Sequence, residues 1–330
     1  MAATIPAIQG DTLSLPLPLP LPSREVYQFG NPNTSVENIA VRRNGDLLVT
    51  LLTPSAQLHL IRDPYSEKPS VSLVHHFDEV EGLLGIAETK PDTFLVMGSN
   101  LEGKANASAV FEVDFSTGHT VPSTRLVARI SESRLLNGAA ALPGCGRGLV
   151  LVAESILGQV FRVDARTGHY DVAIDVTQMK GDPKALVPVG INGIKVHDGY
   201  VYFSNSFTVS IYRLKITEDG SPAEGAVVET VATFTGEKFL DDFTFGRDGT
   251  IWAASNKGNT LYAISPGGKA ILVLGSASST VLKSDTAGAF GRTEQDRHML
   301  YVTTNMPGRV VAVDTSMYRE CADAEKTVRS

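Results

Sequence analysis

An internal repeat constrains the fold of this chain more than any other feature of its sequence. Six segments share one pattern: a short strand ending in small or polar residues, a turn, and then a second short strand. Asp46–Thr53 followed by Gln57–Asp63 is one copy, and Thr250–Asn256 followed by Thr260–Ser265 is another. Alternating apolar residues, many of them β-branched or aromatic, predict strands in each copy. The repeat takes precedence over the two domains that 330 residues would otherwise suggest.

A further short strand is expected before each pair, and these strands share one phase of apolar residues. They are Glu37–Val41, Leu84–Glu88, Asn137–Ala141, Asn192–Val196, Asp241–Phe245 and, more loosely, Thr286–Phe290. They recur about every 45–55 residues, which is the spacing of propeller blades. A sheet of that size cannot bury both faces alone, but six sheets arranged radially cover one another. The sequence therefore predicts an all-β, six-bladed β-propeller, with an array of β-sandwiches as the alternative.

The ends of the chain should close the ring through a shared blade. Arg24–Phe29 is a strand-like run before the first repeat, and we expect it to form the outer strand of the last blade. The predicted organisation is a Pro/Leu-rich extended lead-in at residues 1–22, a propeller at residues 23–316 and a charged tail at residues 317–330. Helix is expected at most near Asp296 or after Thr315.

Composition narrows the classes of protein further. Lys and Arg number 29 against 36 Asp and Glu, giving a net charge of −7, so a nucleic-acid binder is not expected. No apolar stretch is long enough to span a membrane. Two distant cysteines, Cys145 and Cys321, fit a reducing cytoplasmic location, whereas sequons at Asn33 and Asn106 leave secretion open. The oligomeric state is not predicted.

Polar residues at the start of the first strands are the candidate catalytic residues. In a propeller these strands line the central channel, so Glu37, Asn137, Asn192, Asp241 and the adjacent Asp242 should converge on one mouth. Carboxylate and amide oxygens arranged in this way suit a hard cation such as Ca²⁺. Singly, Asn-Gly and Asp-Asp are also common in turns. Their shared phase in several blades favours a site.

This phase resembles that of the SMP-30/gluconolactonase/LRE-like family of six-bladed propellers, over residues from about 24 to 315. The resemblance implies that Glu37, Asn192 and Asp241 hold a divalent metal, that Asn137 faces substrate, and that Asp241 is the general base of a lactone hydrolysis. The sequence departs from that family's Glu-Gly-Pro motif at Asn38 and from its Asp-Gly motif at Asp242.

Other segments resemble a fungal branch of the same family, namely Val36–Thr53, Leu240–Phe243 and Phe290–Thr293. This branch includes hetero-Diels–Alderases, which join a quinone methide to a terpene alkene in tropolone–sesquiterpenoid biosynthesis. The resemblance implies a secondary-metabolite enzyme whose substrates are a reactive polyketide and a terpene. Such a cycloaddition requires no cofactor. It requires an apolar pocket that holds both reactants in position and hydrogen-bond donors aimed at the quinone-methide oxygen.

Apolar and hydrogen-bonding residues near the strand ends are the candidate substrate-binding residues. They are Met97, Ser99, Asn205, Ser206, Phe207, Trp252, Ser255, Asn256, Asn305 and Met306. The loop Gln178–Val189 is a candidate lid. Three functions follow in order of preference: a hetero-Diels–Alder cycloaddition, a lactone hydrolysis dependent on Ca²⁺ or another divalent metal, and non-catalytic binding.

Overall fold

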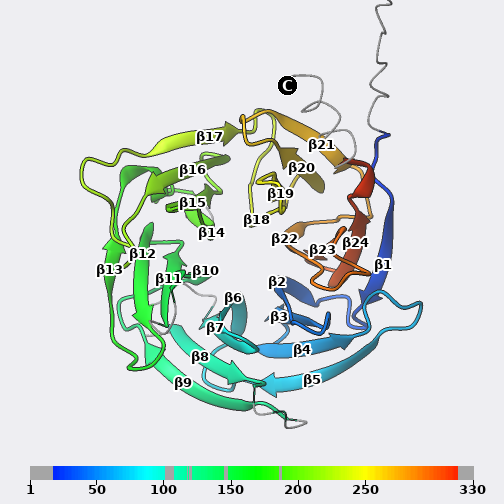
Figure 1. The fold of residues 1–330 in the computed structure, drawn as a ribbon, viewed down its shortest axis with the longest axis horizontal. Coiled ribbons are helices and arrows are strands. Elements are labelled where there is room, and N and C mark those ends of the chain that lie inside the picture. The colour runs from blue at the N-terminus through cyan, green and yellow to red at the C-terminus, as the bar shows by residue number, and fades with distance from the viewer. Residues whose placement is uncertain are drawn as a thin grey trace, which may run out of the picture.

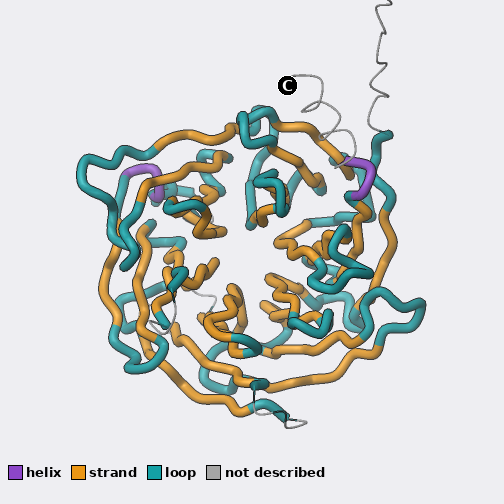
Figure 2. Tube along the Cα trace, viewed as in Figure 1, coloured by secondary structure: helices purple, strands orange, loops and turns teal. Residues whose placement is uncertain are grey.

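Six antiparallel sheets stand around a central axis, each with four strands (Figure 1). The computed structural model describes residues 18–100, 108–116, 118, 121–144, 148–185 and 188–318. The predicted six-bladed propeller is confirmed. Helix is limited in the described residues to a 3-10 turn at Thr177–Met179 and a short turn at residues 316–318, which Figure 2 shows beside a chain built almost wholly of strands and loops. None of the helices in these ranges is long and apolar enough to cross a membrane.

The first five blades each run outward from the axis in chain order. Blade one contains β2 (Ser35–Val41), β3 (Leu47–Thr53), β4 (Gln57–Arg62) and β5 (Ser70–His76), and blade two contains β6 (Gly82–Lys90), β7 (Thr93–Ser99), β8 (Ser108–Asp114) and β9 (Ser123–Arg129). Blade three contains β10 (Leu136–Ala141), β11 (Leu149–Glu154), β12 (Gln159–Asp164) and β13 (Tyr170–Ile174). Blade four contains β14 (Ile191–His197), β15 (Tyr200–Asn205), β16 (Ser210–Lys215) and β17 (Glu229–Thr233), and blade five contains β18 (Phe243–Phe245), β19 (Ile251–Ser255), β20 (Thr260–Ile264) and β21 (Ala270–Gly275).

Blade six closes the ring with strands from both ends of the chain. It contains β22 (Asp285–Phe290), β23 (Met299–Thr304), β24 (Arg309–Asp314) and, as its outer strand, β1 (Ser23–Gln28). The pairing of Ser23 with Val313 and of Gln28 with Arg309 confirms the predicted closure. The two strands lie side by side in Figure 1, β1 in blue and β24 in red. A shared blade ties the two ends together, so the ring cannot open without breaking a strand ladder.

The core lies between neighbouring blades rather than within one sheet. Val49 and Ile61 of blade one, for example, share a buried cluster with Ala287 and Tyr301 of blade six. Because each blade is covered on both faces, apolar residues occupy both phases of its inner strands. Leu21 is also buried and its backbone N–H donates to the carbonyl of Val273, so the end of the predicted lead-in packs on the propeller. Residues 1–17 of the lead-in and residues 319–330 of the tail lie outside the described residues.

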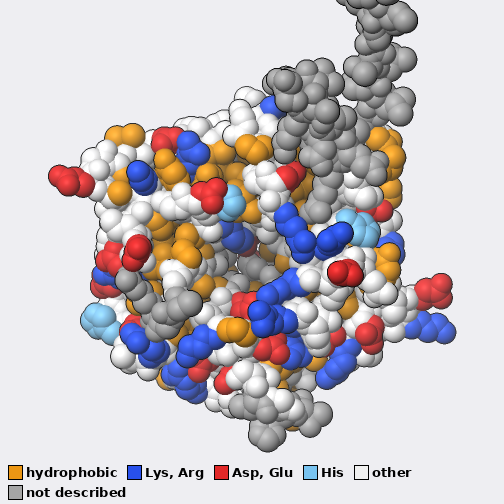
Figure 3. All heavy atoms as spheres, viewed as in Figure 1, with side chains coloured by type: hydrophobic (Ala, Val, Ile, Leu, Met, Phe, Trp, Pro, Cys, Tyr) orange, Lys and Arg blue, Asp and Glu red, His pale blue; other side chains and the backbone are white. Residues whose placement is uncertain are grey.

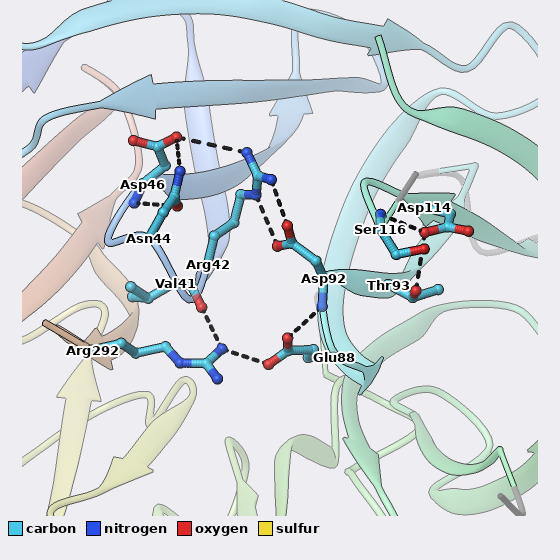
Figure 4. Close-up of polar contacts among 10 residues, drawn as sticks. All are labelled: Val41, Arg42, Asn44, Asp46, Glu88, Asp92, Thr93, Asp114, Ser116 and Arg292. Atoms are coloured by element: carbon cyan, nitrogen blue, oxygen red, sulfur yellow. Dashed lines mark hydrogen bonds and ion pairs between the residues drawn. The ribbon is translucent and has the colours of Figure 1, made fainter. Parts of the chain in front are cut away.

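Charged side chains connect three blades at the far ends of the inner strands (Figure 4). Arg292 of blade six donates to the carbonyl of Val41 in blade one at 2.9 Å and to Glu88 of blade two at 2.5 Å. Arg42 of blade one forms two hydrogen bonds to Asp92 of blade two, at 3.0 and 2.6 Å. These contacts fix the end of the channel that lies opposite the predicted site.

Candidate functional site

Backbone irregularities mark the start of the inner strands. The register shifts between Val36 and Asn38 in β2, and similar shifts occur in β6, β10, β14 and β22. A bulge of this kind changes the direction of a side chain at the end of a strand. The pairs that follow, such as Ile39 with Val49 and Ile194 with Phe203, are equivalent in their blades. The residues two positions before such paired residues are equivalent in four blades, and they are Glu37, Asn137, Asn192 and Asp241.

Hydroxyl groups hold the backbone at this position. Ser204 donates to the carbonyl of Asp241 at 2.6 Å, so blade four fixes the start of blade five. Thr286 of blade six similarly donates to the carbonyl of Val36, the residue before Glu37, at 2.8 Å. These bonds are buried, and each gives the carbonyl group a donor from the neighbouring blade.

Two buried carboxyl groups interact at the channel mouth. Burial raises the pKa of Glu37 to about 7, and the negative charge of Asp242 adds to this rise. Burial, together with the charges of Glu37 and Asp242, raises the pKa of Asp241 well above its usual value. Asn256, a predicted site residue, donates to Asp241 at 3.0 Å. Asp285 is a further buried carboxyl group whose charge raises the pKa of Asp241, and the sequence analysis did not select it.

The two amide side chains of the site have different partners. Asn137 donates to Ser155 at 3.1 Å and Asn192 donates to Ser206 at 3.0 Å. The Oδ1 atom of Asn192 is buried and accepts no hydrogen bond in the described part of the chain. A buried carbonyl oxygen without a hydrogen-bond donor costs folding free energy unless a ligand donates to it or is coordinated by it.

The donor atoms of Glu37, Asn192 and Asp241 are of the types that bind a divalent cation. Within the described ranges no group of three or more His, Cys, Asp or Glu side chains is arranged to hold a metal. A metal at this mouth would therefore need the Asn192 amide oxygen as its third protein ligand. The free Oδ1 atom makes the residues present compatible with such an ion.

Asp242 has a different environment from Asp241. Its carboxylate accepts hydrogen bonds from Lys195 at 2.7 and 2.9 Å, from Asn38 at 3.0 Å and from the backbone of Phe243 at 2.7 Å. Its oxygens are thus already paired by protein groups. Asn38 and Lys195 were not predicted as site residues. The sequence offered one indication of this pair, since Asn38 occupies the glycine position of the Glu-Gly-Pro motif in the SMP-30/gluconolactonase/LRE-like family.

Phe207 and Met306 lie exposed at the mouth. They sit in the turns between β15 and β16 and between β23 and β24, and about half of each side chain is accessible to solvent. Since second strands run antiparallel to inner strands, these turns lie on the face where Glu37 lies. Asn305 lies beside Met306, and its buried Oδ1 atom accepts no hydrogen bond from any described residue.

Other predicted substrate-binding residues make contacts within the protein. Met97 is buried in the core between blades two and three, and Trp252 is buried against Phe290 and Tyr318. Their side chains are therefore not brought to the mouth. The polar ones bond to neighbouring segments: Ser99 to Ser108 and Leu136, Ser206 to Leu240, Ser255 to Glu237, and Asn205 to the carbonyls of Gln178 and Lys180.

The candidate lid Gln178–Val189 is anchored at both ends. Asn205 holds the backbone near Gln178, and Met179 and Val189 are buried. Residues 186–187 of this loop lie outside the described residues.

One cavity lies away from this mouth. It measures about 340 Å³ and is lined by residues such as Asn44, Asp46, Tyr65 and Asp296, at the opposite ends of the inner strands. Figure 3 shows that the ring is also hollowed at its centre on the face in view, with Lys and Arg side chains gathered beside the hollow.

The six sheets in a ring define the class of fold, a six-bladed β-propeller, which solved structures share. A regucalcin from Agrobacterium tumefaciens, a calcium-binding protein, superposes with a TM-score of 0.63 at 17% identity, covering 89% of this chain and 94% of that one. A luciferin-regenerating enzyme superposes with a TM-score of 0.62 at 14% identity, covering 89% and 95%. At this level of identity the likeness concerns the fold alone.

Sequence relatives identify the family more narrowly. A protein of Phoma sp named "Putative hetero-Diels-Alderase" is 36% identical over 312 residues, which cover 86% of this chain and 87% of the relative. A protein of Sarocladium schorii with the same designation is 35% identical, covering 89% of this chain and 84% of the relative. No protein-family model matches the chain. The chain belongs to the hetero-Diels–Alderase family that these two fungal proteins represent.

Proposed function

We propose that this protein is a biosynthetic enzyme of secondary metabolism that catalyses an intermolecular hetero-Diels–Alder cycloaddition between a quinone methide and a terpene alkene. The observation that carries the proposal is the family membership, since two relatives bearing that name align over more than four fifths of the chain. The proposed reaction site is the channel mouth formed by the starts of the inner strands. No metal or other cofactor takes part in this reaction.

In this reaction all bonds form between the two substrates, and the protein forms no covalent bond. One C–C bond and one C–O bond form from three π bonds, one new π bond remains, and no atom is lost. Catalysis then comes from holding the two reactants together and from hydrogen bonds to the heterodiene oxygen. Phe207 and Met306 supply exposed apolar surface at this mouth. Burial raises the pKa of Glu37 to about 7, so part of this carboxyl group is protonated at neutral pH, and in that form it can donate a hydrogen bond to the heterodiene oxygen.

The test is a cycloaddition assay with purified protein. A quinone-methide precursor and a terpene alkene are incubated with the protein, and the rate of adduct formation and its enantiomeric excess are measured. We expect a faster reaction and one dominant stereoisomer, with both effects kept in the presence of a chelator. Adduct formed at the buffer rate and as a racemate would overturn the proposal. Ligand binding without rate enhancement would instead favour a non-catalytic binding propeller.

A metal-dependent lactonase is the second candidate function. It is favoured by one observation, the unpartnered Oδ1 atom of Asn192 in a ring with Glu37 and Asp241. A bound divalent ion would polarise a lactone carbonyl and lower the pKa of a water molecule. The protein's own residues would hold the ion, and Asp241 would accept a proton from the attacking water. Lactone hydrolysis that is abolished by chelation and by Asn192→Ala would support this function over the cycloaddition.

A further inference from the structure

The position that follows the ring of site residues differs among the six blades. Counting from the paired residues of the inner strands, the equivalent residues are Asn38, Gly85, Gly138, Gly193, Asp242 and Ala287. Four of these positions carry glycine or alanine, and only blades one and five carry a polar side chain. Those two side chains meet, with the Nδ2 atom of Asn38 at 3.0 Å from the Oδ2 atom of Asp242.

This contact joins blades that are not neighbours. Blade six lies between blade five and blade one, and it contributes Ala287 at the same level. The hydrogen bond must therefore run on the axis side of β22, inside the channel. Asn38 is 7% exposed and Asp242 is 4% exposed, so both residues are buried where they meet.

Lys195 of blade four completes the contact from the other side. Two positions further along the inner strands, the other five blades carry Ala40, Ala87, Ala140, Thr244 and Ala289, so Lys195 is the one long side chain at this level. Its Nζ atom lies 2.7 Å from Asp242 and 5.5 Å from the centre of the Phe243 ring.

Glycine at position 193 makes room for this arrangement. A Cβ atom there would lie 2.1 Å from the Oδ1 atom of Asp242, which is far inside a van der Waals contact. Asn38, Asp242 and Lys195 thus form a channel bridge between blades one, five and four. Asn38 and Asp242 directly follow Glu37 and Asp241 in the sequence, and Lys195 lies three residues after Asn192, so the bridge lies further along the inner strands than the site residues.

We propose that the channel bridge is the floor of the substrate pocket, where it sets the depth of the pocket and so selects substrates by length. This proposal rests on the proposed function for the identity of the substrates. The bridge is suited to the role because its polar groups are hydrogen-bonded to one another. An apolar ligand can therefore pack against them without leaving a buried polar group unpaired. Substrates would then enter and leave only by the mouth that carries Phe207 and Met306.

The test compares terpene alkenes of increasing chain length. Asn38→Gly removes the group that reaches across the channel, and Asn38→Ser is the second variant should the first not fold. Asn44→Ala is the matched control, since Asn44 also donates to an aspartate, Asp46 at 2.8 Å, but lies in the turn between β2 and β3. The kcat and KM of each alkene are measured for each protein, together with the Kd of unreactive saturated analogues by fluorescence competition.

We expect the wild type and Asn44→Ala to lose affinity sharply beyond one chain length. Asn38→Gly should extend that limit and raise the kcat/KM of the longest alkene relative to the shortest by roughly tenfold, mainly through KM. An unchanged length limit in a folded Asn38 variant would overturn the proposal. Because the Kd series does not require turnover, a shifted limit without cycloaddition would support the floor while the proposed reaction fails.

Discussion

The pairing of Lys195 with Asp242 provides the sharpest test of the energetics at the centre of the ring. The perturbation is a double-mutant cycle made of Lys195→Met, Asp242→Asn and the double variant. Lys195→Met keeps the aliphatic stem over Phe243 but leaves the Asp242 carboxylate with only Asn38 and one backbone N–H as donors. Asp242→Asn keeps the shape of the side chain and removes its charge.

The expected size follows from the burial of the two partners. Removing one partner of a fully buried ion pair costs about 3–5 kcal/mol, whereas an exposed pair contributes about 0.2–1 kcal/mol. The side chains of Lys195 and Asp242 are 25% and 5% exposed, which places the pair between these limits and nearer the buried one. We expect Lys195→Met to lower the free energy of unfolding by about 3 kcal/mol, and the coupling energy of the cycle to be about 2 kcal/mol.

Urea unfolding at neutral pH, with and without added salt, measures these quantities. Arg213 and Glu229 form the control pair, because their distance is also 2.7 Å but their side chains are 36% and 43% exposed. Their coupling should be below about 1 kcal/mol and should weaken with salt, whereas the coupling of the buried pair should change little. Equal coupling energies and equal salt dependence in the two cycles would refute the argument that burial makes Lys195 and Asp242 a strong pair.

Three further predictions concern other parts of the site. Folding raises the pKa of Glu37 from 4.5 to about 7, so the stabilisation from its bound proton is lost as the pH rises through that range. Urea unfolding in chelator-containing buffer should show the free energy of unfolding falling by on the order of 3 kcal/mol over this rise in pH. The Glu37→Gln variant should lack this part of the fall. Gly193→Ala should lower the melting temperature by several degrees through its clash with Asp242, while Gly30→Ala, which meets no atom within 4 Å, should leave it unchanged. Asn205→Ala should speed tryptic cleavage after Lys180, because its amide no longer holds the carbonyls of Gln178 and Lys180; an unchanged cleavage rate would contradict that anchoring role.

The fold was predictable because its information is repeated along the chain. Each blade must bury both faces against its neighbours, so the same strand pattern recurs six times and errors in one copy are corrected by the others. Ring closure was predictable for a related reason, since Arg24–Phe29 is an unpartnered strand that only the last blade can use. The repeat also revealed the common phase of Glu37, Asn137, Asn192 and Asp241, because each lies two residues before an equivalent paired residue of its inner strand.

The contacts of individual side chains were less predictable. Met97 and Trp252 were selected for their apolar character near strand ends, but an apolar side chain in a propeller packs between blades unless a turn carries it outward, as at Phe207 and Met306. Alternation along a strand does not separate these cases. The turn between the second and third strands is the feature that separates Phe207 and Met306 from Met97 and Trp252, which lie within strands.

The channel bridge shows why a sequence repeat conceals part of its own site. Averaging over blades emphasises what the copies share, and the shared residue after the site position is a small one such as Gly85 or Gly138. Asn38 and Asp242 are exceptions to the repeat, and each has an ordinary explanation when considered alone. Their role becomes visible only in the folded ring, which brings the Nδ2 atom of Asn38 to 3.0 Å from the Oδ2 atom of Asp242 although the two residues are 204 positions apart. Lys195 is the counter-ion of Asp242. Residues at the same level of the channel should therefore be compared across the blades. The positions that depart from the repeat are those most able to distinguish a propeller of this kind from its relatives.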